Sequence, residues 1–151
     1  MKFLPLVALV ASLGLAGCNY DVALTAKPTR KLDERLLGVW LGGDDGKEPM
    51  TVRQLDDSTY VVAMDTDIYR AYYSDLEQTA FLSVQELKGS RHYVYVTAEV
   101  SADGSQLTLR TVSTKVIPEE TKGRTALQKL IKANLGNPKL FSDPLVFKRK
   151  D

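Results

Sequence analysis

The chain has 151 residues, 44% of them hydrophobic, and its 20 Lys and Arg nearly balance its 19 Asp and Glu. This length suits one domain with its own core. The net charge of +1 gives no general attraction to polyanions, so we expect no nucleic-acid partner. A single cysteine excludes an intrachain disulfide, so apolar burial must stabilise the fold.

The first 17 residues have the pattern of a secretory signal peptide. Lys2 leads into an apolar run that ends at Leu15, and small residues follow directly before Cys18. The run is too short to span a membrane as a mature helix. Leu15-Ala16-Gly17-Cys18 resembles the lipobox of bacterial lipoproteins. The alternative is an ordinary signal peptide with a chance cysteine.

The lipobox resemblance implies acylation of the Cys18 thiol, cleavage before it and acylation of the new amino terminus. Several acyl chains together hold a protein on its membrane, so we expect the membrane to be a partner through the lipid on Cys18. Asn19 follows the cysteine, where lipoproteins retained at the inner membrane commonly carry aspartate. The resemblance therefore favours the outer membrane of a bacterial cell envelope.

Residues 18–31 are predicted to form a lipidated tether, because they are polar, carry Pro28 and have no sustained hydrophobic period. At about 3.3 Å per residue such a tether reaches roughly 40 Å, which would hold the domain of residues 32–151 clear of the lipid headgroups. Leu32, Leu36 and Leu37 predict one short helical turn at the start of this domain.

Short strands at regular spacing, bounded by Asp, Gly, Ser or Asn, are predicted after this turn and are typical of a β-meander. The pair Asp103-Gly104 suits a hairpin turn. The predicted strands are 37–42, 48–55, 58–65, 67–74, 78–87, 91–100, 105–113 and 145–150.

A helix is predicted over residues 119–135, where leucine and isoleucine recur at steps of three and four. Glu119 and Glu120 near its start and Lys132 near its end suit the helix dipole. Gly136 is expected to supply a left-handed cap.

This order predicts a mostly β fold: an eight-stranded up-and-down antiparallel barrel with one helix before the last strand. Closure removes the exposed edges of an open meander, although an open, strongly curved sheet packed on the helix is the main alternative. The inward sets, such as Leu82 with Val84 and Val94 with Val96, leave both a modest cavity and a filled interior open.

Gly38-Val39-Trp40 resembles the Gly-x-Trp signature of lipocalins and lipocalin-like bacterial proteins, in which the tryptophan plugs the closed end of the barrel. Phe147-Lys148-Arg149 resembles their late strand, whose arginine stacks over that tryptophan. The resemblance implies that Trp40 and Arg149 form a barrel-closing structural pair. The helix departs from the lipocalin pattern because it precedes the last strand, and no residue here matches a family ligand site.

No catalytic constellation is visible. His92 is the only histidine, so we expect no His-based nucleophilic site, no metal site and no cofactor. The acidic pairs Asp44-Asp45, Asp56-Asp57 and Asp65-x-Asp67 fall at predicted turns, where Asp is favoured for its local hydrogen bonds. We therefore predict that the protein is not an enzyme.

The tyrosine-rich strands offer a candidate binding surface, because tyrosine supplies rigid contact area. Its residues are Arg70, Tyr72, Tyr93 and Tyr95, and the alternative is ordinary β-propensity. The basic residues of the helix region could meet anionic headgroups or a protein, or form a solvated face. They are Lys122, Arg124, Lys129 and Lys132.

We therefore expect a noncatalytic, membrane-anchored binding lipoprotein. It would hold either a small amphipathic ligand in the barrel or an envelope protein on its outer face. The alternative is an inhibitor or protective factor acting on an envelope hydrolase such as lysozyme, although the chain lacks the disulfide usual in such inhibitors.

Overall fold

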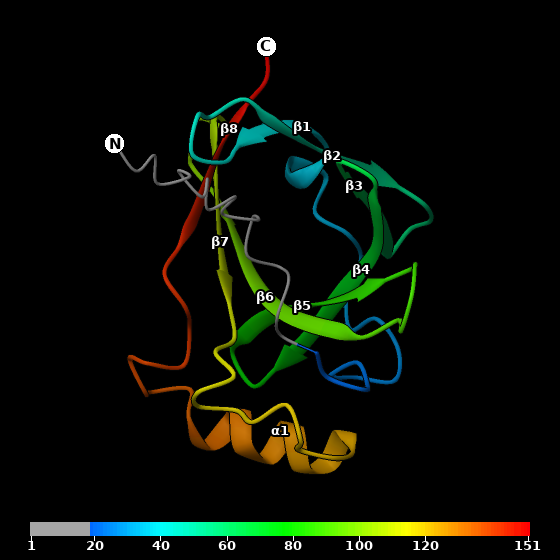
Figure 1. The fold of residues 1–151 in the computed structure, drawn as a ribbon, viewed down its shortest axis with the longest axis vertical. Helices are drawn as coiled ribbons and strands as arrows, with labels where there is room; N and C mark the ends of the chain where they lie inside the picture. The colour runs from blue at the N-terminus through cyan, green and yellow to red at the C-terminus, as the bar shows by residue number, and fades with distance from the viewer. Residues whose placement is uncertain (1–18) are drawn as a thin grey trace, which may run out of the picture.

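Eight antiparallel strands close into a barrel in the computed structural model, which describes residues 19–151 (Figure 1). Each strand pairs with its neighbours in sequence, and β1 pairs with β8 to complete the closure. The strands are β1 (Gly38–Gly42), β2 (Glu48–Gln54), β3 (Thr59–Met64), β4 (Asp67–Leu76), β5 (Thr79–Glu86), β6 (Tyr93–Val100), β7 (Gln106–Thr111) and β8 (Leu145–Arg149). The predicted up-and-down barrel is confirmed. The signal peptide and the lipidation of Cys18 lie outside the described residues.

The two ends of the barrel follow from this order. One end holds the start of β1, the β2–β3, β4–β5 and β6–β7 turns and the end of β8. A short 3₁₀ helix, η1 (Glu34–Leu36), lies directly before β1, and we call this the closed end. The opposite end holds the β1–β2, β3–β4 and β5–β6 turns, the end of β7 and the start of β8, and we call it the loop end.

The 3₁₀ helix η1 is the short helical turn expected around residues 32–37. The Asp33 side chain accepts a hydrogen bond from the Arg35 backbone N–H and so caps its start. Leu36 is buried, and the Trp40 indole N–H donates to the Leu36 carbonyl at 2.9 Å. Helix η1 and the first strand are thus joined at the closed end.

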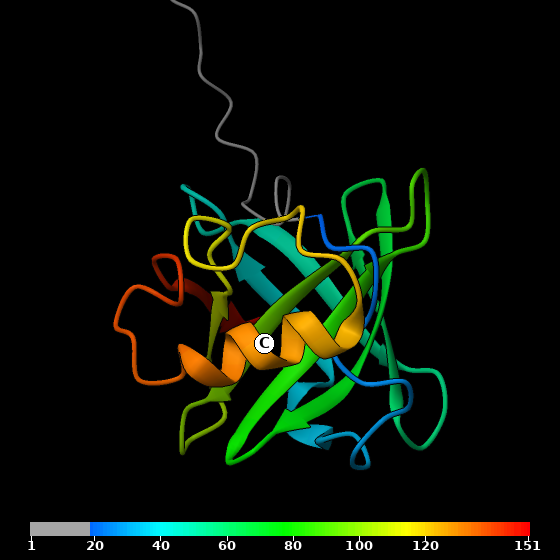
Figure 2. The ribbon, with the colours of Figure 1, turned by 90° about the horizontal axis from the view of Figure 1, so that it is seen from below.

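Within residues 19–151 there is one α-helix, α1 (Arg124–Ala133), which lies across the outside of the barrel (Figures 1 and 2). It is shorter than the predicted 119–135. Gly123 has a φ of +86°, a left-handed conformation that keeps the preceding residues out of the helix. The helix ends at Ala133 with Asn134 as its C-cap, and Gly136 is not among the positive-φ glycines. The predicted left-handed cap at Gly136 is therefore wrong.

Alternation along the strands creates two apolar clusters, one on each face of the same sheet. The inner core fills the barrel and includes Trp40, Leu82, Val94, Val96 and Phe147. The outer layer lies between the outer face of β4, β5 and β6 and the segments that cover it. Its buried residues are Tyr20, Leu24, Leu76, Phe81, Tyr95, Val112, Ile117, Leu127, Ile131 and Leu140.

The amino-terminal segment, residues 20–31, belongs to this outer layer, which corrects the predicted free tether. Tyr20 and Leu24 are fully buried, and the Thr29 N–H donates to the Tyr73 carbonyl at 2.9 Å. Arg30 pairs with Asp75 at 2.7 Å. The sequence pattern was misleading because the burial comes from tertiary contacts with distant strands, which local periodicity does not report.

Candidate functional site

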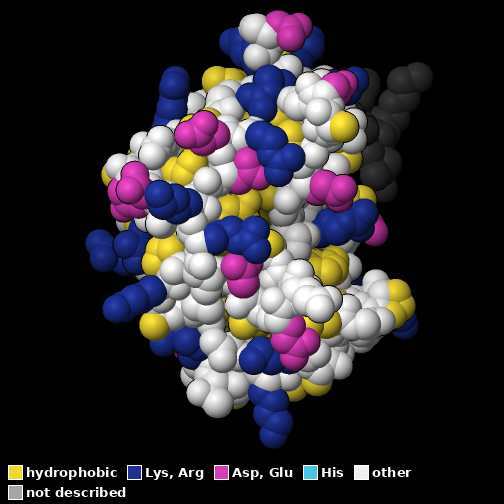
Figure 3. All heavy atoms as spheres, turned by 180° about the vertical axis from the view of Figure 1, so that it is seen from behind, with side chains coloured by type: hydrophobic (Ala, Val, Ile, Leu, Met, Phe, Trp, Pro, Cys, Tyr) yellow, Lys and Arg dark blue, Asp and Glu magenta, His cyan; other side chains and the backbone are white. Residues whose placement is uncertain are grey.

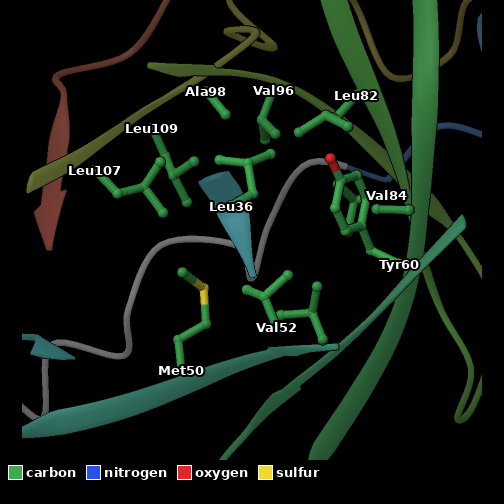
Figure 4. Close-up of a pocket in the computed structure, with 12 residues that line it drawn as sticks. Leu36, Met50, Val52, Tyr60, Leu82, Val84, Val96, Ala98, Leu107 and Leu109 are labelled. Carbon is green, nitrogen blue, oxygen red and sulfur yellow. The ribbon is translucent and has the colours of Figure 1, made fainter. Parts of the chain in front are cut away.

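A cavity of about 50 Å³ lies in the middle of the barrel (Figure 4). Side chains from η1 and from six of the strands point toward it, and no charged residue is among them. They are Leu36, Met50, Val52, Tyr60, Val62, Ala71, Leu82, Val84, Val96, Ala98, Leu107 and Leu109. Such a surface offers contact to an apolar group and no charge to recognise an ionic one.

The one hydroxyl of the lining is already paired. The Tyr60 hydroxyl accepts a hydrogen bond from the Asp33 backbone N–H and donates one to the Asp33 carbonyl. Burial raises the pKa of Tyr60, so this hydroxyl stays protonated at neutral pH. Tyr60 thereby ties the lining to the segment just before η1 and leaves the cavity without a polar anchor.

The cavity is much smaller than the pockets of about 300–1,000 Å³ that hold drug-sized ligands. A chain of several methylenes therefore enters only if lining residues move. Leu36 sits among the lining side chains in Figure 4, and Met50 borders the same space. Met has three rotatable bonds and adapts readily to a new shape, so Met50 is the side chain best suited to yield.

Trp40 and Arg149 are in direct contact. The guanidinium carbon of Arg149 lies 4.1 Å from the centre of the Trp40 ring, a cation–π contact of roughly 1 kcal/mol. The guanidinium also donates to the carbonyls of Gly104 and Leu37, each at 2.8 Å, and to that of Arg35 at 2.7 Å. The contact implied by the lipocalin resemblance is present, and it braces η1 against the β6–β7 turn.

The predicted tyrosine surface is corrected by the structure. Tyr72 and Tyr95 do point outward from the barrel, but both are buried. Their hydroxyls donate to the carbonyls of Thr25 and Val22, and burial raises the pKa of both. They therefore hold the amino-terminal segment, and they do not form an exposed binding surface.

Arg70 and Tyr93 stay nearer to solvent than these two tyrosines. The exposed Arg70 donates to the Gln85 side chain at 2.9 Å. Tyr93 is half-buried and pairs through its backbone with Tyr20. The four predicted residues thus share the outer face of β4 and β6, where Tyr72 and Tyr95 are buried and Arg70 is exposed.

A network of side chains fixes the amino-terminal segment, and no local pattern in the sequence predicts it. The Leu24 N–H donates to Ser83 at 3.0 Å, and Gln128 of α1 donates to the Leu24 carbonyl at 2.6 Å. Ser74 lies 2.8 Å from Ser83 and accepts from Thr25 at 2.7 Å. The segment is not a strand, so side chains satisfy backbone groups that a sheet would otherwise pair.

Charged groups of the helix region hold the same segment. The Lys122 ammonium lies 2.6 Å from the Asp21 carboxylate and lowers the pKa of Asp21. Arg124 donates to the Ala23 carbonyl at 3.0 Å. Two of the four predicted basic residues thus make structural contacts, while Lys129 and Lys132 are exposed.

His92 and two of the paired aspartates have polar partners. The Ser90 hydroxyl lies 3.1 Å from His92 Nδ1, and Asp21 lies 3.9 Å from its Nε2. Asp45 and Asp56 each accept a backbone N–H two residues on, as expected for turns. Within residues 19–151, no three His, Cys, Asp or Glu side chains gather where they could hold a metal ion.

The surface charge is mixed. Figure 3 shows acidic and basic side chains interspersed over the face opposite to that of Figure 1. No single sign dominates this face, so it does not create a strong field for a charged partner.

The chain matches no protein-family model, no curated protein and no solved structure. Among residues 19–151, no helix is both long and apolar enough to cross a membrane.

Proposed function

We propose that this protein is a noncatalytic lipoprotein of the outer membrane, anchored through Cys18. Its lipocalin-like barrel binds the apolar chain of a small amphipathic molecule. The observation that carries the proposal is the cavity on the barrel axis, which is lined by hydrophobic residues from η1 and six strands. The lipobox and the Gly38-Val39-Trp40 strand support the anchor and the fold family.

The two ends of the barrel give the ligand a direction. Four hydrogen bonds stabilise the closed end. Three are donated by the Arg149 guanidinium, and one is donated by the Trp40 indole to the Leu36 carbonyl of η1. Opening that end would break all of these contacts, so the chain enters from the loop end. Its polar head then stays at the loop end, where solvent can hydrate it.

The lining sets the chemical class of the ligand. A buried charge without a partner is costly, and the cavity has no charged residue to pair with one. Each buried methylene, in contrast, contributes about 0.8 kcal/mol. A single unbranched alkyl chain suits this lining, because it is narrow and needs the smallest movement of Leu36 and Met50.

The test uses the lipid-free protein secreted with Cys18→Ser and dodecanoate below its critical micelle concentration. Methyl NMR follows the lining residues Val52, Val84 and Val96 and, as surface controls, Leu55 and Val146. The proposal predicts saturable shifts of the lining methyls with the control methyls unmoved. No saturable shift, or shifts of the surface methyls alone, would contradict it and favour an envelope protein as the partner.

A matched pair of variants locates the binding. Ala71 lines the cavity, whereas Ala63 lies on β3 and is not in the lining. Ala71→Val should weaken dodecanoate binding about tenfold, since it occupies the same space, which corresponds to about 1.4 kcal/mol. Ala63→Val should leave the affinity unchanged. Equal affinities in the two variants would place the ligand outside the barrel.

A further inference from the structure

The amino-terminal segment enters the domain at a fixed point. Tyr20 and Tyr93 exchange two backbone hydrogen bonds of 2.9 and 2.8 Å. The Tyr20 ring is fully buried and stacks on Tyr95 with 4.6 Å between ring centres. Its hydroxyl donates to the Ile117 carbonyl at 2.7 Å. Tyr20 is therefore held beside the start of β6, at the loop end.

This fixed point limits where a lipid on Cys18 can lie. Cys18 precedes Tyr20 by two residues, and two residues span at most about 7 Å. Residues 20–31 cannot extend to add reach, because Leu24, Thr29 and Arg30 are bound to the barrel. The roughly 40 Å of tether expected from the sequence is not available, so the lipid must enter the bilayer next to the loop end.

The loop end also presents apolar side chains to the outside. Ile68 on β4 is 48% exposed, and Leu87 on the β5–β6 turn is 39% exposed. They belong to one patch, because the Leu87 N–H donates to the Ile68 carbonyl at 2.9 Å. Lys88 and Arg91 are exposed on the same turn. Apolar side chains flanked by long basic ones suit the boundary between headgroups and acyl chains.

Charge alone does not determine which end of the barrel faces the membrane. Asp65 on the neighbouring β3–β4 turn and Asp67 at the start of β4 offset Lys88 and Arg91. The closed end has an exposed leucine of its own, Leu55, which is 61% exposed. The position of the lipid anchor distinguishes the two ends, because Cys18 is two residues from Tyr20, which is buried at the loop end.

We propose that the loop end of the barrel rests on the phospholipid surface, with Ile68 and Leu87 at the level of the headgroups. This inference rests on the proposed lipidation of Cys18. It deepens the proposed function, because the entry of the barrel then faces the bilayer. An amphipathic molecule would pass between membrane and cavity without crossing bulk water.

The test compares exposed leucines at the two ends. The mature lipoprotein is reconstituted into vesicles of phosphatidylethanolamine and phosphatidylglycerol, with either Leu87→Cys or Leu55→Cys carrying an environment-sensitive fluorophore. A headgroup-attached nitroxide then quenches labels that lie near the membrane. The proposal predicts quenching several-fold stronger at position 87 than at position 55. Equal quenching, or stronger quenching at position 55, would overturn it.

A second pair repeats the comparison on strands. Ile68→Cys lies near the start of β4, at the loop end, and Arg53→Cys lies near the end of β2, at the closed end, and both positions are exposed. The label at position 68 should be quenched more strongly than the label at position 53, and the reverse order would overturn the orientation.

The mass of the intact protein separates the two proposals. A mature chain without acyl mass at Cys18 defeats the lipoprotein proposal and the orientation with it. A lipidated chain with inverted quenching defeats the orientation alone.

Discussion

The inner core and the outer layer lie on opposite faces of the same strands, yet they are packed by different chemistry. The middle of the inner core is aliphatic, contains a cavity and has its single hydroxyl turned to a backbone group. The outer layer contains stacked Tyr20 and Tyr95 and the serine pair Ser74 and Ser83. In a simple barrel the outer face of the strands meets solvent. In this protein the outer face is covered, and it carries the aromatic stacking and the side-chain hydrogen bonds.

This difference separates two tasks. The outer layer must fix an irregular segment, so its side chains donate to and accept from backbone groups that have no sheet partner. The interior must only exclude water, and its aliphatic side chains can move without breaking hydrogen bonds. A barrel that is stiffened from outside can tolerate an adaptable interior, which is what binding an alkyl chain requires.

The largest expected loss of stability comes from a substitution at the closed end of the inner core. Trp40→Ala removes a fully buried indole and its contacts with Arg149 and Leu36. The free energy of unfolding should fall by about 3–5 kcal/mol, measured by urea titration. Leu55→Ala, at an exposed turn, should change it by less than about 0.5 kcal/mol. A loss of similar size in both variants would contradict the role given to the closed end.

A smaller effect is expected where the outer layer holds the amino-terminal segment. Tyr95→Phe leaves the Val22 carbonyl without the donor that it has now, while the ring can still stack on Tyr20. The free energy of unfolding should fall by about 1–2 kcal/mol. The control is Tyr93→Phe on the same strand, whose side chain is less buried. If both substitutions are neutral, the segment is not held as described.

Filling the cavity should stabilise the inner core. A void of about 50 Å³ at roughly 24 cal/mol per Å³ corresponds to about 1 kcal/mol. Ala71→Val should therefore raise the free energy of unfolding by up to about 1 kcal/mol, in the same variant that loses ligand affinity. Thermal unfolding measures the change, with Ala63→Val as the control. A destabilised Ala71→Val protein would mean that the lining cannot accommodate two more methyl groups.

The smallest effect concerns the ion pair that joins Lys122 to Asp21. Lys122 lowers the pKa of Asp21 from its ordinary 3.8, so the unfolded chain takes up this proton at a higher pH than the folded one. The stabilisation is complete above the unfolded pKa and is lost as the pH falls through the folded pKa. The urea midpoints of wild type and Lys122→Gln should differ slightly at about pH 6 and converge towards about pH 2. A gap that widens in acid would contradict this account.

Local patterns predicted most of the barrel. Alternation placed Leu82, Val84, Val94 and Val96 on the inner face, and all four are in the inner core. The contact between Arg149 and Trp40 followed from resemblance of their strands to a known family. Helix α1 was recognised by its period, but the conformation of Gly123, which a sequence does not report, shortened it.

Alternation and helical period did not predict the outer layer. Alternation says that Tyr95 points out of the barrel, and it does, but it cannot say that Tyr20 will cover it. That burial depends on Leu24 meeting Ser83, 59 residues away. Sequence reasoning consequently described an exposed tyrosine surface and a free tether where the structure has one packed layer.

Native mass spectrometry of the Cys18→Ser protein, recovered gently from its own envelope extract, tests the central claim most directly. The account predicts a reproducible small added mass that disappears on denaturation and is strongly reduced in Ala71→Val but retained in Ala63→Val. A bare protein, or an added mass equally abundant in both variants, would contradict a ligand held inside the barrel.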